Sequence, residues 1–175
     1  AAFQEICLIE CDDGIDFDLD TLKIEEIRKD ANYSGLRISL VGFVDGARCP
    51  IQVDIGYGDA VTPAPETAEY PVMLSESPVP VLRVYPRYTV IAEKFEALIS
   101  LGMINTRLKD YFDLWVILTT AELDQNLLGE AIATTWARRE TTLPSSRPVG
   151  LSEEFSADAM KIAQWNAFVK KNQLD

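Results

Sequence analysis

Residues 35–57 read GLRISLVGFVDGARCPIQVDIGY, with Asp45-Gly46 near the middle of the stretch. Alternation of apolar and other side chains is typical of a strand with one buried face, and Asp-Gly is a strong turn signal between paired strands. The stretch therefore predicts an antiparallel β-hairpin. Its alternating apolar side chains are Leu36, Ile38 and Leu40 before the turn, and Ile51, Val53, Ile55 and Tyr57 after it.

Two segments before the hairpin have regular apolar spacing. LKIEEIR at residues 22–28 fits a strand or a short helix, and we expect a strand. AAFQEICLIE at residues 1–10 has helical spacing, with Phe3, Ile6 and Cys7 as its apolar markers. Because the first residues already look helical, we expect the chain to be part of a longer polypeptide.

The second half of the chain has a different pattern. Six prolines lie between Asp59 and Pro86, and they predict an extended connection because proline lacks a backbone donor and disfavours helix in the residue before it. Beyond them the apolar period becomes about 3.6 residues, which predicts helices. Their apolar markers span residues 90–98, 108–118, 123–136 and 162–168.

Strands followed by a run of helices predict an α+β fold, with a mixed or antiparallel sheet and a C-terminal helical bundle. We expect one folding unit with three sections: a sheet core at 1–60, a proline-rich connection at 61–86 and a helical lobe at 87–175. Neither a GxGxxG nor a GxxxxGK[ST] phosphate loop is present, which disfavours a Rossmann or P-loop protein.

Composition excludes several functions. A formal charge of -12 argues against a general grip on nucleic-acid backbone, so any such contact must be local. The chain has no histidine, which removes Ser-His-Asp triads, Cys-His dyads and histidine-ligated metal sites. Its three cysteines do not form a disulfide framework. No apolar run is long enough for a membrane span, and we expect a cytoplasmic protein.

Asp54 is an unusual residue for its position, because aspartate is depleted in strands and this one lies inside IQVDIGY. Strand alternation places it on the face opposite Val53 and Ile55. It is either part of a solvated sheet face or a carboxylate held on a rigid strand toward a metal ion or a basic partner.

Asp113 is the only polar side chain in YFDLWVIL, a helix that we expect to be buried nearly all round. A buried carboxylate needs a partner. Lys109 lies four residues earlier, and Arg107 can pair with Asp110 in the same way. A structural ion pair and a functional site both remain open.

Lys94 and Glu93 lie in YTVIAEKFEALISLG, and a helical lysine is usually solvated. The place of Lys94 in the chain makes it a candidate site residue, because a strand carboxylate precedes it and a helical pair of carboxylates follows it. Phosphoryl chemistry uses such charged side chains on rigid elements. The sequence also predicts a local cationic patch near this site, formed by Arg83, Arg87, Lys94, Arg107 and Lys109.

Three ordered motifs resemble the AbiEii/AbiGii toxin group of nucleotidyltransferases, the toxins of type IV toxin-antitoxin systems. In that family one strand ends in a single aspartate, one helix carries E-K-[LF]-x-A, and another begins [RK]-D-x-x-D-L. This chain has QVDIG at 52–56, EKFEA at 93–97 and KDYFDL at 109–114. The similarity covers roughly residues 30 to 140 and implies a nucleotidyltransferase-like sheet.

The resemblance implies a role for each motif. Asp54 would lie beside Mg²⁺ as a metal ligand, and Lys94 would contact the triphosphate of an NTP. Asp110 would belong to the catalytic site with Asp54 and Lys94, and Asp113 would orient Asp110 or brace Lys94. Glu93 and Lys109 are expected to support the site. The acceptor would be a hydroxyl on RNA, with tRNA expected, and a cognate antitoxin would neutralise the toxin.

The family's first motif, a glycine turn followed by a D-x-D strand, has no clear counterpart here. Asp16-Phe17-Asp18 has the right letters, but only Gly14 precedes it, and we interpret it as unrelated. We expect the motif to lie upstream of Ala1, so that this fragment would be inactive. The alternatives are a non-catalytic interaction domain of the same fold, or a hydrolase or kinase-like enzyme that releases phosphate or labels protein.

Overall fold

The computed structural model describes residues 2–27 and 35–174, which form two compact units, 1–59 and 60–175. Each unit is treated by itself. The predicted single folding unit and its section boundaries stay predictions. Ala1, at the start of the predicted N-terminal helix, and Arg28, at the end of the predicted first strand, lie outside the described residues. In the described part, no helix is long and apolar enough to span a membrane.

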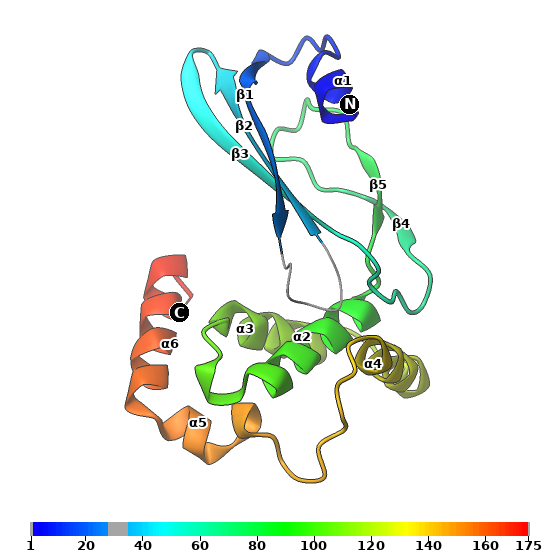
Figure 1. Cartoon of the computed structure of the whole chain (residues 1–175), viewed down its shortest axis with the longest axis vertical. Coiled ribbons are helices and arrows are strands. Elements are labelled where there is room, and N and C mark those ends of the chain that lie inside the picture. Colours follow the sequence, from blue (N-terminus) through cyan, green and yellow to red (C-terminus); the bar gives the residue numbers. More distant parts are fainter. Residues whose placement is uncertain (1, 28–34, 175) are drawn as a thin grey trace. The chain divides into compact units, whose positions relative to one another are not determined.

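The first unit is built on the hairpin that the sequence predicts. A short helix, α1, covers Ala2–Cys7, as expected. An antiparallel sheet follows in the order β1-β2-β3 (Figure 1). Asp45 and Gly46 form the tight turn with φ of 47° and 77°, values that aspartate and glycine tolerate. The strands are β1 (Ile15–Ile27), β2 (Gly35–Val44) and β3 (Ala47–Gly56).

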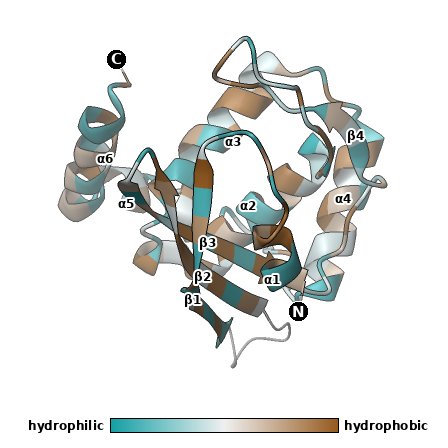
Figure 2. Ribbon diagram, turned by 90° about the horizontal axis from the view of Figure 1, so that it is seen from above, coloured by the Kyte–Doolittle hydropathy of each residue, from teal (hydrophilic) through white to brown (hydrophobic). Residues whose placement is uncertain are grey.

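The predicted strand at 22–28 is therefore confirmed as far as Ile27, and it begins earlier than expected. Brown and teal bands alternate along β3 in Figure 2, as the period of two requires. Ile38 and Leu40 are buried, whereas Asp54 is exposed on the other face of β3. The α+β class is confirmed, since this sheet is followed by helices.

The second unit begins with two short strands that the many prolines of this segment did not suggest. The expected extended connection contains a small antiparallel sheet of two strands that were not predicted, β4 (Glu66–Glu69) and β5 (Val81–Val84). The prolines flank the two strands without interrupting them, and an isolated strand pair tolerates proline at its ends.

The four predicted helices are confirmed as α2 (Arg87–Leu101), α3 (Leu108–Thr120), α4 (Gln125–Arg138) and α6 (Ala159–Asn172). Shorter elements were not predicted: η1 (Gly102–Ile104), η2 (Val149–Leu151) and α5 (Glu153–Ala157). Gly102 ends α2 with a positive φ of 48°, as a glycine after a helix commonly does.

Helix α2 packs against both α3 and α4 and forms the centre of the second unit. The core consists of Ile91 and Leu98 of α2 with Leu114 of α3. The rings of Phe95 and Trp136 join α2 to α4 with centroids 5.4 Å apart. Because these contacts hold α2 in place, they also position the polar residues that alternate with the apolar ones on this helix.

The expectation that α3 is buried nearly all round is wrong. Trp115 is 62% exposed and Leu118 is 52% exposed, whereas Asp110 and Leu114 are buried. The apolar side chains of this run lie on two faces of α3. One face packs on α2, and the opposite face lines a cavity beside α5 and α6.

Gly150 of η2 is a position where we predict a large packing effect. A β-carbon there would lie 2.6 Å from the backbone oxygen of Leu98 and 3.1 Å from the hydroxyl of Tyr111. Because that carbonyl belongs to a buried helix, Gly150→Ala is expected to lower the free energy of unfolding by about 1–3 kcal/mol. Urea unfolding measures the change.

Gly129 of α4 is the matched control, because a β-carbon there meets nothing within 4 Å. Gly129→Ala should stabilise the chain by roughly 0.5–1 kcal/mol, since glycine weakens a helix interior. A Gly150→Ala protein as stable as the wild type would contradict the close approach of η2 to α2.

Candidate functional site

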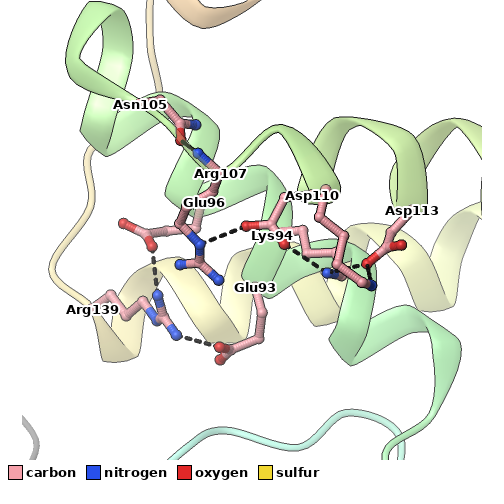
Figure 3. Close-up of polar contacts among 9 residues, drawn as sticks. Glu93, Lys94, Glu96, Asn105, Arg107, Asp110, Asp113 and Arg139 are labelled. Carbon is pink, nitrogen blue, oxygen red and sulfur yellow. Dashed lines mark hydrogen bonds and ion pairs between the residues drawn. The ribbon is translucent and has the colours of Figure 1, made fainter. Parts of the chain in front are cut away.

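Lys94 of α2 lies between two carboxylates of α3 (Figure 3). Its Nζ donates to Asp110 Oδ1 at 2.7 Å and to Asp113 Oδ2 at 2.7 Å. The side chains are 18%, 6% and 20% exposed for Lys94, Asp110 and Asp113. This contact joins two of the three sequence motifs and is the central feature of the site.

Local sequence explains the arrangement. Asp110 and Asp113 are three residues apart, which places them one turn apart on the same side of α3. Asp110 lies in the first turn of α3, where the helix dipole stabilises a negative charge. Leu114 anchors the same side of the helix in the core, so both carboxylates face α2.

Two further cations flank the carboxylates. Arg107 Nε lies 2.8 Å from Asp110 Oδ2, and Lys109 Nζ donates to Asp113 Oδ2 at 2.6 Å. Both pairs were predicted from helical spacing. We call these five residues the Lys94 cluster. Its three cations and two carboxylates leave one positive charge, which favours an anionic ligand.

One oxygen of the cluster is incompletely satisfied. Asp110 Oδ2 is buried and has no hydrogen-bond partner among the described residues, although Arg107 lies close enough for an ion pair. A buried acceptor without a hydrogen bond is unusual in a folded protein. Arg107, 2.8 Å from this oxygen, balances its charge without a hydrogen bond.

Charge pairing determines the pKa values of the cluster. Burial acts to lower the pKa of Lys94, but hydrogen bonds to Asp110 and Asp113 outweigh it and raise that pKa above 10.5. Burial acts to raise the pKa of Asp113, but hydrogen bonds from Lys109 and Lys94 hold it below 3.8. Both groups are therefore charged at neutral pH.

A pH-dependent loss of stability follows from Asp113. Its stabilising charge is fully present above the unfolded pKa and is lost as the pH falls through the lowered folded pKa. We expect Asp113→Asn to be less stable than the wild type at neutral pH, with the difference shrinking as the pH falls below 3.8. Urea unfolding at a series of pH values measures it, and a constant difference would show that Asp113 acts through packing.

A second network lies beside Lys94 on the same helix. Arg139, just after α4, donates to Glu96 at 2.7 Å and also contacts Glu93 (Figure 3). Thr141 Oγ1 donates to the other oxygen of Glu96 at 2.7 Å. The predicted supporting residue Glu93 therefore holds α2 to α4. Sequence reasoning missed Glu96 and Arg139, because no local spacing connects α2 with the end of α4.

Asp54 lies on the sheet of the first unit. Arg37 Nε and Nη2 donate to its two carboxylate oxygens, each at 2.8 Å. The register aligns Glu25, Arg37 and Asp54 across β1, β2 and β3. The side chains of Arg37 and Asp54 are 39% and 40% exposed, so this ion pair is a partly solvated one that Asp54 can exchange for another cation.

The predicted site residues thus occupy the two units. Lys94, Lys109, Asp110 and Asp113 meet in the second unit, and Asp54 lies in the first. The joint action of Asp54 with Lys94 and Asp110 stays a prediction. Within the predicted cationic patch, Lys94, Arg107 and Lys109 share the cluster, while Arg83 lies on β5 and Arg87 begins α2.

The Asp16-Phe17-Asp18 motif lies on β1. Asp18 pairs across the sheet with Val41, whereas Asp54 aligns with Arg37, four residues away along β2. Asp18 Oδ1 accepts from the backbone of Asp20 at 3.1 Å, beside an irregularity in the strand. Asp18 therefore makes a local contact, and our interpretation of the motif stays a prediction.

The donor set for a resident metal ion is small. Within residues 2–27 and 35–174, no group of three or more Asp, Glu, Cys or His side chains could hold an ion. The carboxylates of the Lys94 cluster are paired with cations, and Asp54 is paired with Arg37. The predicted metal ligand Asp54 stays a prediction.

Comparison with known families gives one finding. A family described as "Nucleotidyl transferase AbiEii toxin, Type IV TA system" matches residues 1–175. No curated protein matches, and no solved structure matches.

Proposed function

The chain belongs to the AbiEii nucleotidyl transferase toxin family of type IV toxin-antitoxin systems, and we propose that it transfers a nucleoside monophosphate from an NTP to RNA. The family implies a transferase and a cognate antitoxin. We further propose tRNA as the acceptor and the cytoplasm as the place of action. An acceptor hydroxyl oxygen would attack the α-phosphorus, lose its proton and displace pyrophosphate.

The Lys94 cluster carries this proposal. Such a transfer requires positioning and charge stabilisation of phosphates, with little covalent chemistry by the protein. Lys94 is a compact cation on a rigid helix, held by two carboxylates, in a cluster with one surplus positive charge. We assign it the contact with the triphosphate.

The other residues act around that contact. Asp110 is proposed to orient Lys94 in the site, and Asp113 to brace it from the other side. Magnesium would arrive bound to the triphosphate substrate, because Mg²⁺ keeps most of its waters and takes one or two carboxylates together with phosphate oxygens. Asp54 stays our proposed carboxylate for that ion.

The activity is tested directly by incubating the purified chain with each of four labelled NTPs and total RNA. Label in RNA supports the transferase, and a size-selected tRNA fraction tests the proposed acceptor. Label in protein, or release of free phosphate without labelled RNA, would favour the kinase-like or hydrolase alternative. No transfer to RNA by this chain or by a longer polypeptide that contains it would overturn the proposal.

A non-catalytic interaction domain is the second candidate function. It is favoured by the pairing of Asp54, Asp110 and Asp113 with cations of the same chain. In that case the Lys94 cluster only stabilises the fold. The purified antitoxin should then bind the chain equally well when Lys94 is replaced, while RNA is not labelled under any condition.

Asp54→Ala separates the two candidates. The Arg37–Asp54 pair is partly exposed, so its loss should change stability little. If Asp54 contacts the magnesium of the substrate, RNA labelling should fall by at least about 100-fold in the folded variant. Glu25→Ala, in the same cross-strand row, is the matched control and should keep its labelling rate. Unchanged labelling in Asp54→Ala would remove Asp54 from the site.

A further inference from the structure

A cavity of about 670 Å³ lies on the far side of α3 from the Lys94 cluster. Leu108, Tyr111 and Trp115 of α3 line it, at spacings that place them on one face of the helix. Asp110 and Asp113 project from the opposite face. The cavity is therefore separate from the cluster, and its volume suits a ligand of nucleotide size.

Four aromatic side chains contribute to the wall of this cavity. Tyr111 and Phe155 stack on each other with centroids 5.2 Å apart. Trp115 and Trp165 also line it, and they are 62% and 37% exposed. Exposed indoles beside a cavity offer flat apolar faces on which a planar ring can stack.

A buried cation lies in the same wall. Lys161 of α6 is 6% exposed, and its Nζ donates to the backbone oxygen of Asn105 at 2.7 Å and to Gln164 at 3.4 Å. No carboxylate lies within 4.0 Å of this ammonium among the residues that the structure describes. The ammonium also lies 5.2 Å from the centre of the Phe155 ring, so the groups that contact it are neutral and none of them balances its charge.

The remaining charges at the cavity favour an anion. Arg147 lines it together with Lys161, and Glu153 is the acidic residue among the lining side chains. Two cations against one carboxylate leave a positive balance. Stacking surfaces and buried positive charge together match a ligand with a flat ring and an anionic group.

We propose that this cavity binds a nucleoside monophosphate unit, with the base against Trp115 or Trp165 and the phosphate against Lys161. The choice of a nucleotide among aromatic anions rests on the proposed function, since the transferase would handle nucleotides. The same chemistry is supplied by a free nucleoside monophosphate or by one unit of a single-stranded RNA.

Tryptophan fluorescence tests the proposal. Two of the three tryptophans line the cavity, and the third, Trp136, is buried in α4. Titration with each nucleoside monophosphate should quench the emission saturably, and a nucleoside without phosphate should bind at least about tenfold more weakly. A short single-stranded oligoribonucleotide forms the second arm. Quenching by the oligonucleotide alone would identify an RNA strand as the source of the unit.

Lys161→Met keeps the length of the side chain and removes its charge. It should weaken binding by about tenfold or more without unfolding the chain, because a buried charge is replaced by an apolar group. Lys171→Met, an exposed position on the same helix, is the matched control and should bind as the wild type. Trp165→Leu should lower the amplitude of the quench.

The result is independent of catalysis because no triphosphate is used. Absence of quenching by both monophosphates and oligonucleotide, or equal quenching in Lys161→Met, would overturn the inference even if RNA is labelled in the transfer assay. Conversely, Lys161-dependent quenching without any transfer leaves this cavity as a nucleotide site and counts only against the transferase.

Discussion

Lys94→Met is expected to lower RNA labelling by about 10²- to 10³-fold, the effect of removing one preorganised charge from a phosphoryl or acyl transfer site. The physical reason is the fixed position of Lys94, which two carboxylates hold at 2.7 Å each. A flexible surface lysine would contribute far less. Initial rates of RNA labelling under excess NTP measure the effect.

The variant also disturbs the fold, and this effect must be separated from the first. Without Lys94, the buried Asp110 keeps only the ion pair with Arg107 within the cluster, and we expect a loss of about 1–3 kcal/mol in unfolding free energy. A double variant, Lys94→Met with Asp110→Asn, also removes the charge of the buried carboxylate that has lost its hydrogen bond from Lys94. It should regain stability while remaining inactive.

Lys94→Arg gives a further comparison. Arginine keeps the charge but cannot place a compact ammonium between both carboxylates, so we expect labelling between that of the wild type and that of Lys94→Met. A folded Lys94→Met protein that labels RNA within about threefold of the wild-type rate, less than 1 kcal/mol of transition-state stabilisation, would exclude Lys94 from the chemistry.

Local patterns predicted most of the elements that carry these residues. Asp45-Gly46 predicted the turn of the hairpin, because a two-residue turn needs residues that tolerate positive φ. The pairs Arg107–Asp110 and Lys109–Asp113 followed from helical spacing. The order of the motifs along the chain added Lys94 to the predicted site residues. Its contact with both carboxylates depends on the packing of α2 on α3, which local patterns do not describe.

Other features had no local signal. β4 and β5 have four residues each, and short strands among prolines are hidden by the composition of the segment. Lys161 looks like any charged residue of an amphipathic helix until its burial is known. The apolar run around Asp113 predicted a helix buried nearly all round, but α3 exposes Trp115 beside a cavity. These features depend on which helices meet, and local periodicity does not contain that information.

Arg139 is the clearest example of a residue visible only in the folded chain, and we predict that it contributes strongly to stability. Its side chain is 15% exposed, and its guanidinium links Glu93 and Glu96 of α2 to the end of α4. Arg139→Met leaves Glu96, whose side chain is 6% exposed, with Thr141 as its remaining hydrogen-bond partner among the described residues. Breaking a buried ion pair in this way is expected to remove about 3–5 kcal/mol of unfolding free energy.

Thermal unfolding should show a decrease of about 6–20 °C in Tm, since 1 kcal/mol corresponds to about 2–4 °C in a chain of this size. The double variant Arg139→Met with Glu96→Gln removes the uncompensated charge and should recover most of the loss, because glutamine can still accept from Thr141. Recovery distinguishes a buried charge from lost packing. If the double variant is as unstable as Arg139→Met, the long side chain of Arg139 stabilises α2 and α4 by its apolar contacts instead.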